Sequence, residues 1–334
     1  MISKAAVVGA GAMGTICAQI LATNGASVDL LCRRRDAADE MRMTRENRRY
    51  LPGIRLPDPI RPTGDAAAAL ANAELVISAV PCQHLRGVWP SIGRLVEADA
   101  AICSVTKGIE SNTLALPTQI IRQFAPNHAV AVLSGPTIAP EVAKCLPATV
   151  VVAGSPPVTA ELVQQAMTTS WFRVYTNPDL LGVELGGALK NVIALAAGIL
   201  DGLHAGDNAK AALLTRGLAE ITRLAVAMGA YPETLMGLAG VGDLVTTCVS
   251  PLGRNRTAGQ RIASGETIAD ITREGASVVE GIPTTGAALA LAARLGVEMP
   301  ITQAVSDVLH GRKTPLGAIT ELMNRPPKAE GTRP

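Results

Sequence analysis

The chain has 334 residues, which is too many for one small hydrophobic core and suits two domains. Thirty basic and 28 acidic side chains leave a net charge of +2, and this near balance argues against a nucleic-acid-binding protein, which carries a basic excess or stripe. A small anionic ligand, which needs only local positive charge, stays compatible with this composition.

The first half of the chain alternates short apolar runs with helical patterns. Such runs suit strands buried on both faces of a parallel sheet, and their alternation with helices specifies a doubly wound α/β domain of the Rossmann type. We predict strands at residues 5–9, 27–32, 74–80, 100–105, 129–134 and 149–153, with a weak one at 59–63, and helices around residues 15–24, 36–48, 83–95 and 114–124.

The first predicted strand ends in a glycine-rich turn that opens the first helix. Gly9 permits the tight turn, Gly11 lets the backbone approach a pyrophosphate, and Gly14 allows close contact between strand and helix. In this strand–turn–helix context the spacing predicts dinucleotide binding; the alternative is a glycine-rich turn without a ligand. The apolar N-terminus superficially resembles a secretory signal, but the glycines that interrupt it argue against one.

The second predicted strand ends with three arginines, Arg33, Arg34 and Arg35, and no carboxylate precedes Asp36. An acidic side chain here would favour the free 2′-hydroxyl of NAD, whereas arginine accommodates the 2′-phosphate of NADP. We therefore predict a dinucleotide cofactor, with NADP preferred to NAD. The alternative, a solvated charge run after a strand, accounts for at least one of the three arginines.

Polar residues follow two later strands, at the carboxyl ends where ligands bind in open α/β sheets. Lys107 follows the fifth strand, where an anionic or carbonyl-bearing substrate would meet a nicotinamide ring. The turn that contains Gly135 and Thr137 follows the next strand and could line the same cleft.

The pattern changes near residue 178. From Asp179 onward the sequence shows long helical segments rich in alanine and leucine, separated by glycine and proline turns, and no convincing strand. We predict a dinucleotide-binding domain at residues 1–177, an all-helical domain at 178–323 and a flexible tail at 324–334. The long helices could form the interface of a homodimer, but they suit the core of one chain equally.

Lys190 is the only charged residue between Glu184 and Asp201, in an apolar helical run. A buried ammonium group loses hydration that must be replaced, so a lysine is rarely placed there for packing. Burial also makes an amine more useful in acid–base chemistry. The alternative is that its stem lies along apolar surface while the ammonium group reaches water.

Two polar turns separate apolar helices farther along the chain. The first contains Asp243, and the second contains Gly253, Arg254 and Asn255. Arg254 and Asn255 could hold a phosphate through charge-assisted hydrogen bonds. Each turn, taken singly, is more often ordinary loop polarity.

The six cysteines are scattered, without a Cys-x-x-Cys pair or a nearby histidine cluster. We therefore predict no metal site and no disulfide framework, and expect buried free thiols in a reducing compartment. Apolar runs such as 145–160 contain proline and glycine and are too short to cross a bilayer. We expect a soluble, cytoplasmic protein without a membrane span.

These motifs together resemble, in order, those of the bacterial NAD(P)-dependent glycerol-3-phosphate dehydrogenases over about residues 2–320. The segments Thr106-Lys-Gly-Ile-Glu and Gly186-Gly-Ala-Leu-Lys-Asn are the specific ones, because many dehydrogenases share the glycine pattern. The resemblance implies a helical domain of the 6-phosphogluconate dehydrogenase type. It also implies reversible reduction of dihydroxyacetone phosphate to sn-glycerol 3-phosphate, for glycerophospholipid synthesis.

The resemblance implies a role for each matching residue. Lys190 is the proton donor and acceptor, and Lys107 is the second catalytic residue. The implied substrate contacts are Lys107, Gly135, Thr137, Lys190, Asn191, Asp243, Gly253, Arg254 and Asn255. The implied cofactor contacts are Gly9, Gly11, Ala12, Met13, Gly14, Arg33, Arg34, Tyr50, Lys107, Ala139, Arg254, Val278 and Glu280.

The sequence departs from the family at several positions, which bear on affinity and cofactor choice. Ala12 and Met13 stand where serine and an aromatic residue are common, Ile138 replaces phenylalanine, Pro140 replaces lysine and Gly253 replaces serine. Two other functions stay open: a two-domain dehydrogenase acting on a hydroxyacid or ketopantoate, and a dinucleotide sensor without turnover. Lys107 and Arg254 favour a phosphorylated substrate over the first of these.

Overall fold

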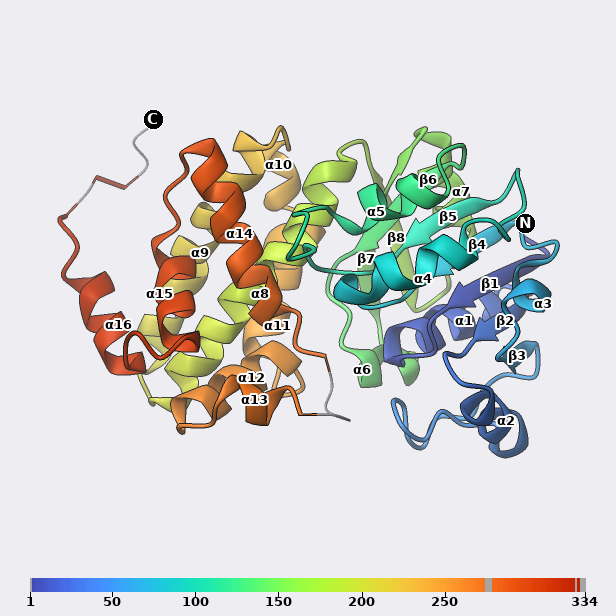
Figure 1. Ribbon diagram of the computed structural model, residues 1–334, viewed down its shortest axis with the longest axis horizontal. Helices are drawn as coiled ribbons and strands as arrows, with labels where there is room; N and C mark the ends of the chain where they lie inside the picture. The colour runs from blue at the N-terminus through green and yellow to red at the C-terminus, as the bar shows by residue number, and fades with distance from the viewer. Residues whose placement is uncertain (1, 274–277, 328, 331–334) are drawn as a thin grey trace.

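The structure, a computed structural model, describes residues 2–273, 278–327, 329 and 330. A sheet with flanking helices forms one half of the molecule and a bundle of helices forms the other (Figure 1). The sheet has eight strands in the order β3-β2-β1-β4-β5-β6-β7-β8. The strands are β1 (Lys4–Val8), β2 (Ser27–Leu31), β3 (Ile60–Thr63), β4 (Leu75–Ser78), β5 (Ala101–Ser104), β6 (Val130–Ser134), β7 (Ala148–Ser155) and β8 (Phe172–Asn177).

The first six strands run parallel, and each predicted strand is confirmed. The prediction of a parallel sheet is wrong at one edge, because β7 runs antiparallel to β6, with Val132 opposite Ala153. An apolar run indicates that a strand is buried, but strands of either direction bury the same side chains. β8, which pairs parallel with β7, was not predicted. Its alternation of buried Phe172 and Val174 with exposed Tyr175 is a strand signal of period two.

Helices cover both faces of the sheet. They are α1 (Ala12–Thr23), α2 (Arg35–Thr44), α3 (Ala66–Leu70), the 3₁₀ turn η1 (Cys82–His84), α4 (Leu85–Ile92), α5 (Pro117–Phe124), α6 (Ala139–Ala143) and α7 (Val158–Met167). The predictions of α1, α2, α4 and α5 are confirmed. Helices α3 and α6 are too short to show a period of 3.6 residues, and α7 begins directly after two prolines.

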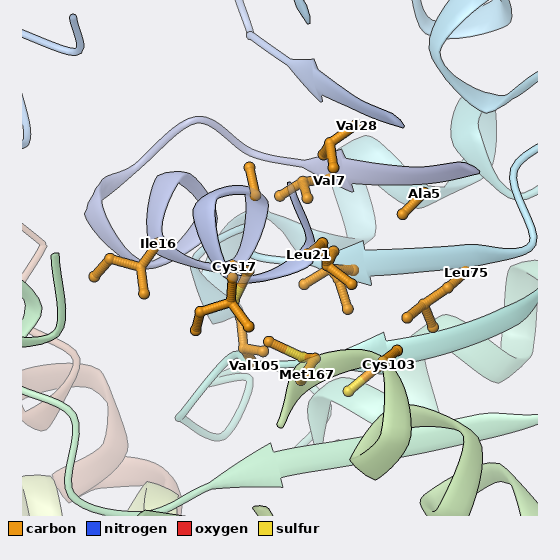
Figure 2. Packing of buried hydrophobic residues seen from close by; sticks show 14 of the residues in the cluster. Ala5, Val7, Ile16, Cys17, Leu21, Val28, Leu75, Cys103, Val105 and Met167 are labelled. Atoms are coloured by element: carbon orange, nitrogen blue, oxygen red, sulfur yellow. The ribbon is translucent and has the colours of Figure 1, made fainter. Parts of the chain in front are cut away.

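The strands divide their side chains between two apolar layers. Ala5 and Val7 of β1 pack against α1 and α7, and Figure 2 shows them with Cys17, Leu21 and Met167. The alternate residues of β1, Ala6 and Val8, pack on the opposite face with α3, α4 and α5. This double burial explains why the strands are apolar without interruption.

The helical half is built around α8 (Leu180–Gly202). The other elements are α9 (Asp207–Ala227), α10 (Pro232–Leu235), the π-helical turn η2 (Leu238–Gly242), α11 (Asp243–Val249), α12 (Arg254–Ala263), α13 (Ile268–Ile271), α14 (Gly281–Leu295), α15 (Pro300–Leu309) and α16 (Pro315–Met323). The described residues after β8 contain no strand, as predicted. A Cβ added at Gly198 of α8 would collide with the carbonyl oxygen of Arg256, so glycine lets α12 lie against α8.

Helix α8 is long and apolar enough to cross a membrane, and the bent pair Pro232–Val249 with Arg254–Ala263 passes the same test if counted as one span. The apolar stretch of α8 is entirely buried among other helices, so it faces protein and serves as a core helix. The predicted tail lies partly outside the described residues, and its described residues are exposed.

All six cysteines are free thiols. Cys145 is exposed, so the expectation that all are buried is wrong there: it lies in the turn after α6, with φ +58°. Burial raises the pKa of the Cys32 thiol to about 11 and that of Cys17 to about 12. The described residues hold no cluster of three or more metal-ligating side chains.

Candidate active site

One carboxylate joins the two predicted catalytic lysines. The Nζ of Lys190 lies 2.6 Å from Oδ1 of Asp243, and the Nζ of Lys107 lies 2.6 Å from Oδ2. Lys107 also donates to the carbonyl oxygen of Gly135 at 2.9 Å. Lys190 is only 6% exposed, so the alternative that its ammonium group reaches water is wrong. The three side chains come from α8, α11 and the segment after β5, so the site lies between the two halves.

Local structure explains how these elements come so close. Gly187 of α8 faces β6, where an added Cβ would lie 2.5 Å from Oγ of Ser134 and 3.4 Å from Cγ of Lys107. Gly135 has φ +130°, which favours glycine and turns the chain directly after β6. Asp243 begins α11 directly after the π-helical turn η2.

The surroundings of Lys107 lower its pKa, and burial is the main cause. Burial, first, and then the nearby charges of Lys190 and Arg254 bring the pKa of Lys107 down to about 8, while Asp243 opposes the shift. Two ammonium groups share a single carboxylate, so positive charge is in excess. Such a site suits a small anion, and an amine with a pKa near 8 can exchange a proton close to neutral pH.

The start of α12 is held by amide contacts. Asn255 donates to the side-chain oxygen of Asn191 at 2.9 Å and accepts from the backbone N–H of Gly281 at 2.9 Å. Asn191 and Asn255 are both buried, so these bonds fix α12 and α14 to α8. A Cβ at Gly253 would lie 2.7 Å from the carbonyl oxygen of Thr247, so the family's common serine does not fit here without a backbone shift.

Arg254 and the segment before α14 face the sheet. Arg254 donates to the carbonyl oxygen of Val278 at 3.2 Å. Glu280 accepts from the backbone N–H of Cys82, beyond the end of β4, at 2.9 Å. The second oxygen of Glu280 is buried without a partner among the described residues, and burial raises the pKa of this carboxyl. The orphaned oxygen fits a residue that awaits a hydrogen-bond donor from a ligand.

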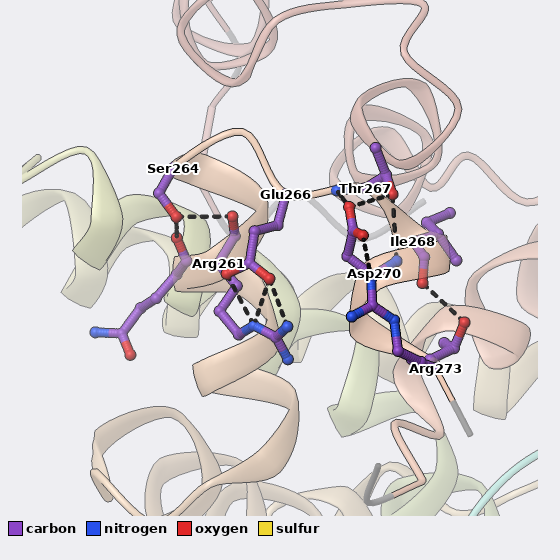
Figure 3. Close-up of polar contacts among 9 residues, drawn as sticks. Arg261, Ser264, Glu266, Thr267, Ile268, Asp270 and Arg273 are labelled. Carbon is purple, nitrogen blue, oxygen red and sulfur yellow. Dashed lines mark hydrogen bonds and ion pairs between the residues drawn. The ribbon is translucent and has the colours of Figure 1, made fainter. Parts of the chain in front are cut away.

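Side-chain contacts order the described residues that follow α12, up to Arg273 (Figure 3). Arg261, in the last turn of α12, pairs with Glu266. Thr267 and Asp270 then form a capping box that starts α13, with Oγ1 of Thr267 accepting from the N–H of Asp270 at 3.2 Å. Two of the predicted cofactor contacts, Val278 and Glu280, follow this turn.

The glycine-rich loop has the geometry that dinucleotide binding requires. A Cβ at Gly14 would collide with the carbonyl oxygen of Gly9, and Gly9 itself has φ +108°. At Gly11, by contrast, an added Cβ would meet no protein atom within 4 Å, which leaves the backbone open to a ligand. Ala12 and Met13 begin α1, whose first N–H groups point out of the helix.

Asn47 is a site residue whose role the sequence pattern does not reveal. It is buried, and its amide donates to the carbonyl oxygen of Ala10 at 3.0 Å and to Oγ1 of Thr15 at 2.8 Å. These bonds tie the glycine-rich loop to the segment that follows α2. The sequence signal is a lone asparagine three residues before Tyr50, which is too short a pattern to show a contact 37 residues away.

The remaining predicted residues lie around this loop and the end of β6. Arg33 and Arg34 are exposed after β2, and Nε of Arg34 pairs with Asp36 at 3.0 Å. Tyr50 is half exposed, with the guanidinium of Arg49 5.3 Å from its ring centroid. Thr137 donates to the carbonyl oxygen of Gly135 at 3.2 Å, two residues before α6 begins at Ala139.

A doubly wound sheet with an open glycine-rich loop, joined to helices that bring a buried lysine to the carboxyl ends of the strands, defines a two-domain dinucleotide-dependent dehydrogenase. Family models for the N-terminus and the C-terminus of NAD-dependent glycerol-3-phosphate dehydrogenase match residues 4–160 and 179–320. The chain belongs to this family.

Several glycerol-3-phosphate dehydrogenases are similar to this chain over almost its full length. The glycerol-3-phosphate dehydrogenase (NAD(P)+) of Geobacter sp. (strain M21) is 48% identical over 99% of this chain and 100% of its own, and that of Frankia casuarinae is 47% identical over 98% of each. The crystal structure of glycerol-3-phosphate dehydrogenase from Coxiella burnetii matches with a TM-score of 0.92 and 36% identity over 97% of this chain and 99% of that one. A ketopantoate reductase from Ralstonia eutropha, at 17% identity and a TM-score of 0.59, shares the fold alone.

Proposed function

We propose that the protein reversibly reduces dihydroxyacetone phosphate to sn-glycerol 3-phosphate with NADPH in preference to NADH, and so supplies glycerophospholipid synthesis in the cytoplasm. The observation that carries this proposal is the contact of Lys190 and Lys107 with the single carboxylate of Asp243. It gathers a proton source and an excess of positive charge at the carboxyl ends of the strands, where a phosphorylated ketone would meet the cofactor.

The chain's own residues account for the proton and the charge. A nicotinamide cofactor, held at the glycine-rich loop, would supply the hydride. Lys190, as an ammonium group, gives its proton to the developing alkoxide, and as an amine it takes the proton back in the oxidation direction. Asp243 orients the two lysines, and Lys107 with Arg254 offsets the phosphate charge that would oppose alkoxide formation.

We assign the binding roles by matching position. The substrate contacts are Lys107, Lys190, Asp243 and Arg254, together with Gly135, Thr137, Asn191, Gly253 and Asn255. On the cofactor side, the glycine-rich loop holds the pyrophosphate and Arg33 with Arg34 meets the 2′-phosphate. Glu280 has an oxygen without a partner among the described residues, which we assign to the cofactor, and Tyr50, Ala139 and Val278 complete this side. We place the division between the domains at residues 177 and 178.

A spectrophotometric assay tests the function. The purified protein should oxidise NADPH with dihydroxyacetone phosphate, and more slowly with NADH. Unphosphorylated ketones of the same size should be poor substrates, because they leave the positive charge of the site unpaired. Equal rates with both kinds of ketone would exclude the phosphate assignment. A dinucleotide sensor would bind NADPH and leave it unoxidised with every triose phosphate.

The assembly we propose is a homodimer. Light scattering coupled to size-exclusion chromatography measures its mass directly. A mass equal to that of one chain at the concentrations of the assay would exclude a functional dimer.

A further inference from the structure

Helix α8 carries a second buried charged residue, Glu184, six positions before Lys190. Its carboxylate leaves the helical half and meets the first turn of α5, where it accepts from the backbone N–H of Thr118 at 2.8 Å and from Oγ1 of Thr118 at 2.6 Å. Glu184 and Thr118 are each 2% exposed. This contact, between residues 66 apart in the chain, joins the two halves of the molecule away from water.

The Glu184–Thr118 contact holds one end of the segment that carries Lys107. This segment leaves the sheet at the end of β5 and reaches α5 at Pro117, so the Glu184–Thr118 contact anchors its far end to α8. At its near end, Oγ1 of Thr106 donates to the carbonyl oxygen of Val80 at 2.7 Å. The helix that presents Lys190 therefore also holds the segment that presents Lys107.

Stability alone does not explain a carboxylate at this position. Burial raises the pKa of Glu184 to about 7, against the two hydrogen bonds from Thr118 and the charge of Arg122 on α5. Burial, first, and then the charges of Glu280 and Glu184 raise the pKa of the nearby Cys82 thiol. A buried charge is costly, and a neutral residue of similar shape is often as stable or more stable. A pocket of about 490 Å³ that opens to solvent lies beside Glu184, Thr118 and Arg122.

We propose that Glu184 is a positioning residue, which holds Lys107 against Asp243 and Lys190 by fixing the start of α5 to α8. The kinetic part of this inference depends on the proposed function. Loss of the contact would free the end of this segment at α5 and leave the bonds of Gln83 to Ile109 and of Arg86 to Glu110 as its remaining anchors. Misplacement of a reacting group by about 1 Å can cost on the order of 100-fold in rate.

The first test is kinetic and uses Glu184→Gln, Thr118→Val and the double variant. We expect Glu184→Gln to lower kcat/KM for dihydroxyacetone phosphate by roughly 10- to 100-fold. Thr118→Val should act in the same direction with a smaller effect, because the backbone N–H remains. The double variant should be no worse than Glu184→Gln, since both changes break one contact. Additive losses, or an unchanged kcat/KM in folded variants, would overturn the inference.

Glu220→Gln is the matched control. Glu220 is also a buried carboxylate that accepts from a threonine N–H and hydroxyl, those of Thr302 at 2.8 Å, but both residues lie within the helical half. A general penalty for removing a buried carboxylate would affect both variants. We expect kcat/KM to change only in Glu184→Gln.

The second test needs no turnover. Labelling of Lys107 by an amine-reactive reagent, measured by mass spectrometry as a function of pH, reports its proton affinity directly. The midpoint should lie near pH 8 in the protein without substitutions. It should move upward in Glu184→Gln, because burial and the neighbouring cations lower the pKa of Lys107 and a displaced Lys107 would lose both effects. If the protein without substitutions does not turn over dihydroxyacetone phosphate, the proposed function fails. Independently of that result, an equal labelling midpoint in Glu184→Gln and in the parent protein would reject the positioning role of Glu184.

Discussion

The ammonium group of Lys190 and the carboxylate of Asp243 meet at 2.6 Å in the interior, with side chains 8% and 2% exposed. A buried pair of this kind is rarely favoured for stability, because both charges lose their hydration. Here the other oxygen of Asp243 binds Lys107, so one carboxylate fixes the positions of two amines. This arrangement leads to the first two predictions.

Lys190→Ala should lower kcat by roughly 10²–10⁴-fold, the range expected when a positioned proton donor is lost. Its NADPH affinity should stay close to that of the unmodified protein, since Lys190 lies on α8 and the glycine-rich loop lies between β1 and α1. Stopped-flow turnover and fluorescence titration measure the two quantities separately. Turnover at the unmodified rate would remove Lys190 from the mechanism.

Asp243→Asn should move the alkaline limb of the kcat/KM profile to lower pH. Lys107 has a pKa near 8, so its positive charge is lost as the pH rises through 8. Asp243 raises this pKa against burial, and its removal therefore lowers the pKa further. Asp201→Asn is the control, because Asp201 also bridges two cations, Lys210 and Arg256, within the helical half. A limb that shifts equally in both variants would argue against the assignment to Lys107.

Gly11→Ala should impair cofactor binding without affecting folding, whereas Gly14→Ala should lower the stability of the fold. Protein atoms leave room for a Cβ at Gly11, so the apo protein should keep its Tm, while the Kd of NADPH should rise about tenfold or more because the pyrophosphate can no longer approach. A Cβ at Gly14 collides with the backbone at Gly9, so this variant should lose roughly 1–3 kcal/mol of stability. Calorimetry and titration together check the pair. Unchanged NADPH affinity in Gly11→Ala would place the cofactor elsewhere.

Arg33→Ala should weaken NADPH and spare NADH. A charge-assisted hydrogen bond contributes about 1.5–3 kcal/mol, so the Kd of NADPH should rise roughly 10- to 100-fold. Arg34→Ala should have a smaller effect, because Arg34 already pairs with Asp36. Titration of each variant with both nucleotides gives the comparison. An equal loss for NADPH and NADH would show that Arg33 does not read the 2′-phosphate.

Features that depend on neighbouring residues could be predicted from the sequence. The strand–turn–helix unit around Gly9 follows from the steric freedom of glycine and the apolar period of the flanking elements. The place of Lys107 follows from one topological rule, that ligands lie beyond the carboxyl ends of parallel strands. The long apolar helix with Lys190 was equally visible, because the sixteen residues 185–200 carry no charge other than Lys190, and such a run is typical of a core helix.

Features that depend on distant pairs could not be predicted. The direction of β7 and the pairing of β8 are long-range choices that an apolar run does not encode. The resemblance assigned Lys107, Lys190 and Asp243 to one site, but the sequence did not show that Asp243 lies between the two lysines, 136 and 53 residues away along the chain. The contact of Glu280 with Cys82, 198 residues away, could not be predicted for the same reason.

The sequence by itself determined the kinds of element, the cofactor loop and the residue types available for proton transfer, because propensity, apolar period and glycine sterics act over a few residues. Only the tertiary structure decided that α8 lies on the end of β6, that Asp243 bridges two lysines and that Glu184 binds Thr118. These contacts arise where the helical half packs against the sheet, and their partners are set by three-dimensional distance rather than by position in the chain.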